Sequence, residues 1–121
     1  MCIRDSLKAF TTDAGALAEN LLENGIDAMK IWPFDPAARQ NAGVDISTEQ
    51  LKVAIRPFEL IRKRVGDRMD IMVEFHSLWN LTTAKRIARA LEPFEPTWYE
   101  DPIRMNSSQA LAEYALSLIH I

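Results

Sequence analysis

The chain has 121 residues, with 14 basic and 17 acidic side chains and a formal net charge of −3. This mild acidity gives no support to nucleic-acid binding, which needs a basic patch. No apolar run is long enough to span a membrane, and no signal peptide is evident. The length suits one small domain. The single cysteine, Cys2, excludes a disulfide within the chain and favours a reducing, cytoplasmic compartment.

The two ends of the chain fit one short inverted DNA sequence. Residues 1–6 can be back-translated as ATG TGT ATA AGA GAC AG, and residues 116–121 as CTG TCT CTT ATA CAC ATC. The second string is the reverse complement of the first over nearly its whole length. This sequence resembles the adapter of transposon-based sequencing libraries. We therefore expect both ends to be translated adapter and residues 7–115 to be an internal fragment of a longer protein. A natural arm and tail is the alternative, and the source DNA decides between them. Segments of this kind are excluded from fold reasoning.

The first predicted helix and strand precede a long loop. Thr12 and Asp13 are typical caps for a helix, which the Asn24-Gly25 pair ends. An apolar run over 26–32 predicts the first strand. Proline, asparagine and glycine then predict a loop of about a dozen residues, a length that is often functional, at Pro33, Pro36, Asn41 and Gly43.

Three more helices and two more strands follow in alternation. Residues 47–50 form a capping-box pattern for a helix that Pro57 is expected to kink or split and that Gly66 ends. The second strand is predicted over 70–75 and the third over 97–99, with apolar residues at helical spacing between them. A last helix is expected to begin near Ser107 or Ser108.

This order predicts an α/β fold in which parallel strands are joined by right-handed crossovers and flanked by helices. Two architectures satisfy it. One is part of a (β/α)8 barrel with about three βα units, and the other is a small doubly wound domain. No glycine-rich phosphate loop follows any strand, which weakens a nucleotide-binding interpretation.

Four chemically active side chains come at or just past the ends of the apolar runs: Lys30, Glu74, His76 and Glu100. The carboxyl ends of parallel strands lie on one side of a sheet, where α/β folds keep their sites. Neighbouring strands are about 4.8 Å apart, so Glu74 and Glu100 are close enough to share a metal ion. Two unpaired carboxylates repel each other, and a divalent cation such as Mg²⁺ removes that repulsion.

Histidine and lysine complete the predicted site. Strand alternation places His76 on the same side as Glu74 if the strand continues, where it could act as a general acid or base. Lys30 could hold a substrate carboxylate. The alternatives are a packing or loop histidine, and a surface lysine or an ion pair from Lys30 to Asp35. Four aromatic residues are expected in the core or in a pocket wall: Trp32, Phe34, Trp79 and Trp98.

Several of these segments resemble the mandelate racemase group of the enolase superfamily. Residues 25–32 resemble the second-strand motif of that group, and residues 70–80 its third strand. Residues 98–102 are similar to its fourth-strand Glu-(Glu/Asp)-Pro motif, and the helix after Asn80 is also similar. The resemblance covers most of residues 11–115.

The resemblance implies a magnesium enzyme that removes the proton α to a carboxylate and stabilises the resulting enediolate. By position, Glu74 and Glu100 would be metal ligands, and Lys30 would contact the substrate carboxylate. His76 resembles the histidine that protonates the departing β-hydroxyl in sugar-acid dehydratases. The implied partner is a small sugar acid, with no nucleic acid and no membrane, and the whole enzyme is expected to be a homo-oligomer.

The chain departs from the family pattern in two places. Glu74 stands where Asp is usual, and Trp32 replaces the second lysine of the racemases' Lys-x-Lys pattern, which argues against racemisation. A third ligand and a His-Asp base pair are expected beyond residue 115, and a lid domain before the chain. We therefore expect a fragment of an acid-sugar dehydratase that is inactive alone. The alternatives are a racemase or cycloisomerase of the same superfamily, and a non-enzymatic doubly wound binding module.

Overall fold

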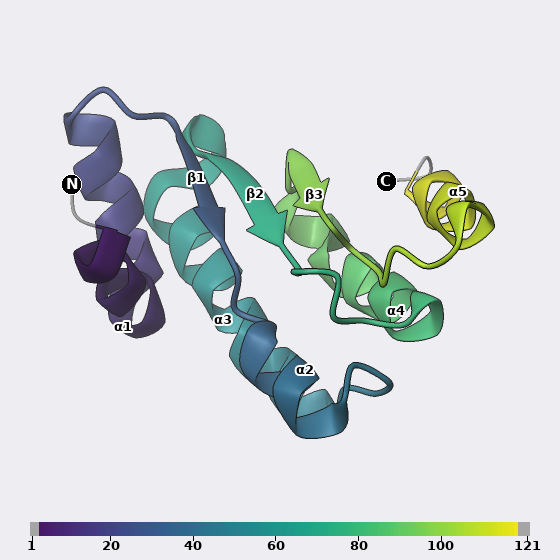
Figure 1. The fold of residues 1–121 in the computed structure, drawn as a ribbon. Coiled ribbons are helices and arrows are strands. Elements are labelled where there is room, and N and C mark those ends of the chain that lie inside the picture. Colours follow the sequence, from purple (N-terminus) through teal and green to yellow (C-terminus); the bar gives the residue numbers. More distant parts are fainter. Residues whose placement is uncertain (1–2, 119–121) are drawn as a thin grey trace.

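The structure is a computed structural model that describes the backbone of residues 3–118 and the side chains of residues 13–118. Cys2 and His120 lie outside these residues, as do parts of both predicted adapter segments. The elements, drawn in Figure 1, are α1 (Ile3–Glu23), β1 (Ala28–Ile31), α2 (Asp35–Asn41), α3 (Thr48–Val65), β2 (Asp70–Glu74), α4 (Leu81–Leu91), β3 (Trp98–Glu100) and α5 (Ser108–Ser117), with short 3₁₀ turns at Gly66–Arg68 and Glu92–Phe94. No helix in the described part of the chain is long and apolar enough to cross a membrane.

The three strands form one parallel sheet in the order β1-β2-β3, which confirms the predicted α/β class. All three arrows in Figure 1 point the same way, with α3 and α4 behind them. The spatial order of the strands follows their order in the chain. A doubly wound sheet reverses its strand order at a switch point, and these three strands contain no such reversal. The order is that expected for part of a barrel.

One face of the sheet carries the core. Successive side chains of a strand point to opposite faces, and Met29, Ile31, Ile71 and Val73 are all at most 6% exposed. The opposite face bears the register row Lys30–Met72–Trp98. Trp98 is 58% exposed, so of its two expected places, the core or a pocket wall, the core is wrong. The physical reason is that its face of the sheet bears no covering helix among the described residues. Phe34 and Trp79 are fully buried, as expected.

Side-chain caps begin the helices at the predicted places. α1 consists of two helices joined at a kink at Asp13, whose backbone is not helical (φ −153°, ψ 86°). Asp13 caps the second of them, because its Oδ1 accepts the Ala16 N–H at 3.0 Å. Ser47 and Gln50 form the predicted capping box. Ser107 caps α5 by accepting the Ala110 N–H at 3.1 Å. These bonds satisfy N–H groups that have no acceptor within the helix.

Two local predictions are corrected by the structure. The segment from Pro33 to Gly43 is not a simple loop, because it contains α2, with Pro36 in its first turn and a left-handed C-cap at Ala42. A proline in the first turn costs no hydrogen bond, so proline there is compatible with a short helix. Of the two effects expected of Pro57, a kink or a split, the split is wrong, because α3 is one helix over Thr48–Val65. Burial of its apolar side in the core offsets the cost of the proline.

Candidate functional site at the strand ends

The carboxyl ends of the strands bring the two predicted metal ligands together. Glu74 and Glu100 are the last residues of β2 and β3, and they are register partners in the parallel sheet. Lys30 on β1 reaches across both, with its Nζ 2.7 Å from Glu100 Oε2 and 3.6 Å from Glu74 Oε2. A predicted lysine and two predicted carboxylates thus form one cluster. The Lys30 side chain remains 40% exposed.

Glu74 is a buried carboxylate with both oxygens engaged. Only 6% of the residue is exposed. Its Oε1 accepts the backbone N–H of His76 at 2.9 Å, while its Oε2 faces the Lys30 ammonium. A buried charge is tolerated when it is paired and hydrogen-bonded. These contacts therefore explain how an acidic side chain can end a core strand.

The charges in the cluster shift one another's proton affinity. The hydrogen bond to Glu100 is the largest cause that raises the pKa of Lys30 above its ordinary value, with the charges of Glu100 and Glu74 adding to it. The same hydrogen bond is the largest cause that lowers the pKa of Glu100 below its ordinary value, and the charge of Lys30 adds to it. Both shifts favour the charged forms. A cation between the two carboxylates is therefore stabilised here, and in this structure that cation is the lysine ammonium.

The donor set fits a hard divalent cation in part. Carboxylate oxygens suit Mg²⁺, which takes one or two carboxylates and fills its remaining positions with water and substrate oxygens. Glu74 and Glu100 supply two carboxylates at adjacent strand ends. Within the described residues no group of three or more His, Cys, Asp or Glu side chains is placed to hold a metal. The chain therefore offers a partial set of ligands.

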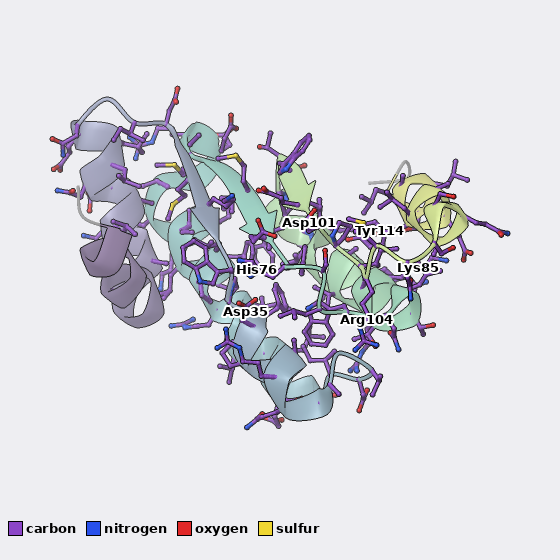
Figure 2. All side chains as sticks on the ribbon, viewed as in Figure 1. Asp35, His76, Lys85, Asp101, Arg104 and Tyr114 are labelled. Carbon is purple, nitrogen blue, oxygen red and sulfur yellow. The ribbon has the colours of Figure 1, made fainter. Side chains whose placement is uncertain are left out.

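His76 contacts the cluster through its backbone N–H, which donates to Glu74 Oε1, while its imidazole faces Asp35. The strand stops at Glu74, and both His76 (φ 54°) and Ser77 (φ 57°) adopt left-handed backbone conformations. The imidazole Nδ1 lies 3.1 Å from Asp35 Oδ1 and 3.0 Å from Asp35 Oδ2. Figure 2 shows these two side chains side by side, Asp35 on α2 and His76 after β2.

Asp35 is the functional candidate that sequence reasoning missed. The sequence offers it only as an ion-pair partner for Lys30, and that alternative is wrong because Lys30 pairs with the two glutamates. Asp35 instead contacts His76 and, at 3.8 Å, Arg39. The available signal was an acidic residue in the segment directly after a strand end, where α/β proteins place functional groups.

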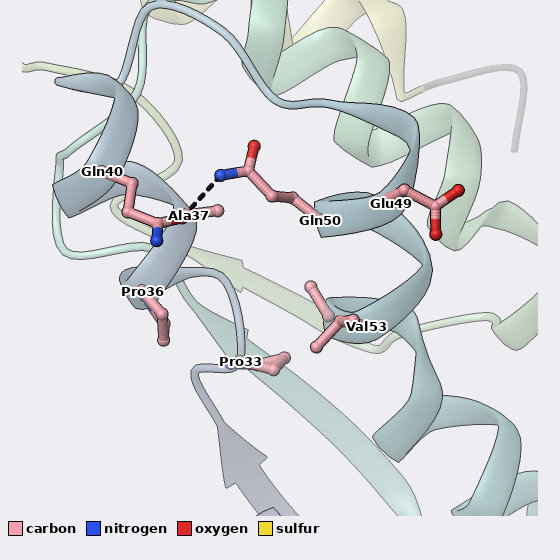
Figure 3. A pocket seen from close by; sticks show the side chains of 8 residues that line it. Pro33, Pro36, Ala37, Gln40, Glu49, Gln50 and Val53 are labelled. Atoms are coloured by element: carbon pink, nitrogen blue, oxygen red, sulfur yellow. Dashed lines mark hydrogen bonds between the residues drawn. The ribbon is translucent and has the colours of Figure 1, made fainter.

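A pocket of about 310 Å³ lies away from this cluster, between α2 and α3. Figure 3 shows Pro33, Pro36 and Ala37 on one side of it and Val53 on the other. Gln50 Nε2 donates to Gln40 Oε1 at 2.8 Å. Its lining is mostly apolar and contains none of Lys30, Glu74, His76 and Glu100. The candidate chemistry therefore belongs to the strand ends and not to this pocket.

Comparison with known proteins identifies the family of the chain. A family model described as enolase C-terminal domain-like matches residues 13–121. A D-gluconate dehydratase from Thermoproteus tenax is 31% identical over 97 residues, which cover 80% of this chain and 18% of that protein.

Two solved structures are more similar in sequence. An enolase of the mandelate racemase subgroup from Agrobacterium tumefaciens is 58% identical, with a TM-score of 0.84 over 86% of this chain and 28% of that chain. An enolase protein from environmental sequencing of the Sargasso Sea is 44% identical, with a TM-score of 0.86 over 90% of this chain and 30% of that chain. The chain thus spans less than a third of the length of these relatives.

Proposed function

The chain belongs to the enolase C-terminal domain-like family, and we propose that it is part of a Mg²⁺-dependent dehydratase that acts on a sugar acid. The observation that carries the proposal is the pairing of Glu74 with Glu100 across two adjacent strand ends, with His76 two residues beyond Glu74. The dehydratase relative supports the reaction class. Because the chain spans only part of its relatives, the proposal concerns the whole protein, and residues 7–115 alone are proposed to be inactive.

Glu74 and Glu100 would hold the metal ion, with a further ligand from outside these residues. When bound, Mg²⁺ supplies positive charge that stabilises the negative charge developing on the substrate carboxylate as the α-proton leaves. Lys30 carries a second positive charge at the same place. It is proposed to bind the substrate carboxylate, because its ammonium already pairs with carboxylates at this place and its side chain is 40% exposed.

His76 is proposed to be the general acid. A base outside the described residues takes the α-proton, and the electrons of that C–H bond form an enediolate and then a carbon–carbon double bond. The β-carbon–oxygen bond breaks, its electrons pass to the hydroxyl oxygen, and this oxygen takes a proton from the His76 imidazolium and leaves as water. The enol product becomes a 2-keto-3-deoxy acid. An imidazole at a strand end beside the cluster suits this role.

A chimera tests the proposal in a complete protein. The matched segment of this chain replaces its counterpart in the Agrobacterium tumefaciens relative, whose 58% identity favours compatible packing. We expect Mg²⁺-dependent release of a 2-keto-3-deoxy acid from a panel of sugar acids that includes D-gluconate, and loss of that product in the His76→Asn variant.

The outcomes that would contradict the proposal are equally specific. A folded chimera that racemises or cyclises its substrate without losing water would favour the racemase or cycloisomerase alternative. A folded chimera in which His76→Asn leaves the rate unchanged would exclude His76 as the acid. Ser77→Ala, one residue further along the same turn, is the matched control and should retain activity.

A further inference from the structure

We propose that Asp35 is the positioning residue for His76: its carboxylate accepts the Nδ1–H of the imidazole, so that Nε2 is the ring nitrogen that transfers a proton. The role of Nε2 rests on the proposed function, whereas the contact between the two side chains does not. Asp35 lies at the start of α2 and His76 follows β2, so 41 residues separate them in the chain. The fold alone brings them together.

The contact defines which atom carries the proton. Asp35 is 6% exposed, and both of its oxygens lie within 3.1 Å of Nδ1. An ionised carboxylate can only accept a hydrogen bond, so the facing imidazole nitrogen must donate one. Arg39 is the other cation at this carboxylate, but its Nη2 is 3.8 Å away and its side chain is 76% exposed. A contact of that kind adds little, so His76 is the principal partner.

The backbone and a neighbouring ring also hold the imidazole in place. The positive φ of His76 is uncommon for a residue with a side chain, and such conformations persist where surrounding contacts fix them. The His76 N–H donates to Glu74 Oε1. Trp32 meets the imidazole edge-on, with ring centroids 6.3 Å apart and planes at 78°. Trp32 and Asp35 both belong to the segment that follows β1, so this segment contacts the imidazole from two directions.

A fixed Nδ1–H has a direct chemical consequence. The imidazolium has two N–H groups, and the one on Nδ1 is held by Asp35. The proton on Nε2 is then the one available for transfer, and the neutral ring that remains is the Nδ1–H tautomer. A carboxylate that orients a histidine in this manner stabilises the imidazolium without itself becoming protonated. Asp35 therefore acts through His76 and does not need to touch the substrate.

The tautomer can be read directly by ¹⁵N NMR of the full chain labelled at histidine. The spectrum is recorded at about pH 8.5, well above the pKa of about 6.5 of an ordinary imidazole. The His76→Asn variant identifies the His76 signals among those of the two histidines. We expect His76 to show a protonated Nδ1 and an unprotonated Nε2. Asp35→Asn should abolish this preference, because an amide can donate as well as accept.

The control is Asp45→Asn, which removes an exposed carboxylate from the loop after α2 and should leave the His76 tautomer unchanged. The proposal is overturned if His76 populates both tautomers in the ratio of histidine in a short peptide, if it shows the Nε2–H form, or if Asp35→Asn leaves its signals unchanged. The measurement uses no substrate and no metal. A positive tautomer result with an inactive chimera would therefore count against the proposed function alone. An active chimera with a negative tautomer result would count against the positioning role of Asp35 alone.

Discussion

Glu74 and Glu100 end adjacent parallel strands as register partners, and the ammonium of Lys30 lies against both carboxylates. Two carboxylates placed side by side repel each other, and a cation between them offsets that repulsion. In this chain a lysine provides it, and in the proposed enzyme a divalent ion would take the same two carboxylates. Lys30 and the metal ion are therefore expected to compete.

Replacing Lys30 with methionine should strengthen the binding of Mn²⁺, used as a probe for Mg²⁺, by roughly tenfold, since a unit positive charge at this distance opposes a second cation even in water. Isothermal titration of the full chain measures the change. The matched control is Lys63→Met, which removes an exposed lysine from α3 and should leave affinity unchanged. Equal affinities in Lys30→Met and the unaltered chain would refute the competition.

The ion pair between Lys30 and Glu100 should stabilise the fold only within a defined pH window. The pKa of Glu100 is lowered from 4.5, so its contribution is present above that value and is lost as the pH falls through its folded-state pKa. The pKa of Lys30 is raised from 10.5, so its contribution is present below that value and is lost as the pH rises through its folded-state pKa.

Glu100→Gln should therefore lower the urea midpoint near neutral pH, and the difference from the unaltered chain should shrink on acidification below about 4.5, the ordinary pKa from which Glu100 is shifted. Glu95→Gln, which removes an exposed carboxylate just before β3, is the control. A difference that stays constant down to strongly acidic pH would show that the ion pair does not cause it.

Gly43 is required by a close backbone approach as well as by its backbone angle. It has φ +69°, and an added Cβ would lie 1.7 Å from the carbonyl oxygen of Leu78. Gly25 has a similar φ of +76° with nothing within 4 Å of an added Cβ. Gly25→Ala should cost roughly 1–2 kcal/mol from conformation alone. Gly43→Ala should cost clearly more in urea denaturation, and equal costs would argue against the close approach.

Tyr114 buries a hydroxyl group that has no hydrogen-bond partner among the described residues. The ring is 2% exposed and meets Tyr99 edge-on at 6.5 Å. Burial raises the pKa of Tyr114, and it raises that of Tyr99 to about 12. Tyr114→Phe should be neutral or stabilising by up to about 1 kcal/mol, because it removes an unsatisfied polar group.

The matched variant for the ring is Tyr114→Ala, which should cost about 3–5 kcal/mol through loss of packing. Both changes are measured by urea denaturation of the full chain. A loss above about 1 kcal/mol in Tyr114→Phe would mean that the hydroxyl group makes a stabilising contact.

The positions of Glu74 and Glu100 could be predicted from sequence because they depend only on where two parallel strands end. The helix caps at Asp13, Ser47 and Ser107 are equally local and were also predictable. Strand alternation does not determine the position of His76, because the strand ends at Glu74 and the condition that it continues is not met. The orientation of His76 depends on two consecutive positive φ values in residues other than glycine, which no local pattern indicates.

The remaining differences come from long-range packing. The contact between Asp35 and His76 joins two elements that are distant in the chain, so neither residue alone indicates it. Trp98 is expected in the core or in a pocket wall, and its 58% exposure excludes the core, because burial depends on what covers its face of the sheet. Sequence patterns predict which face a side chain takes and do not show whether another element covers that face.

Glu74 and Glu100 are proposed to bind together the divalent ion of a larger active site. The most direct test is Mn²⁺ affinity in the chimera with the Agrobacterium tumefaciens relative, measured for Glu74→Gln and Glu100→Gln, with Glu95→Gln as the control. Each ligand variant should weaken binding by roughly tenfold or more, since removing one charge from a site with few ligands costs most of its attraction, while Glu95→Gln should bind as the unaltered chimera does. Unchanged affinity in both ligand variants would contradict the account.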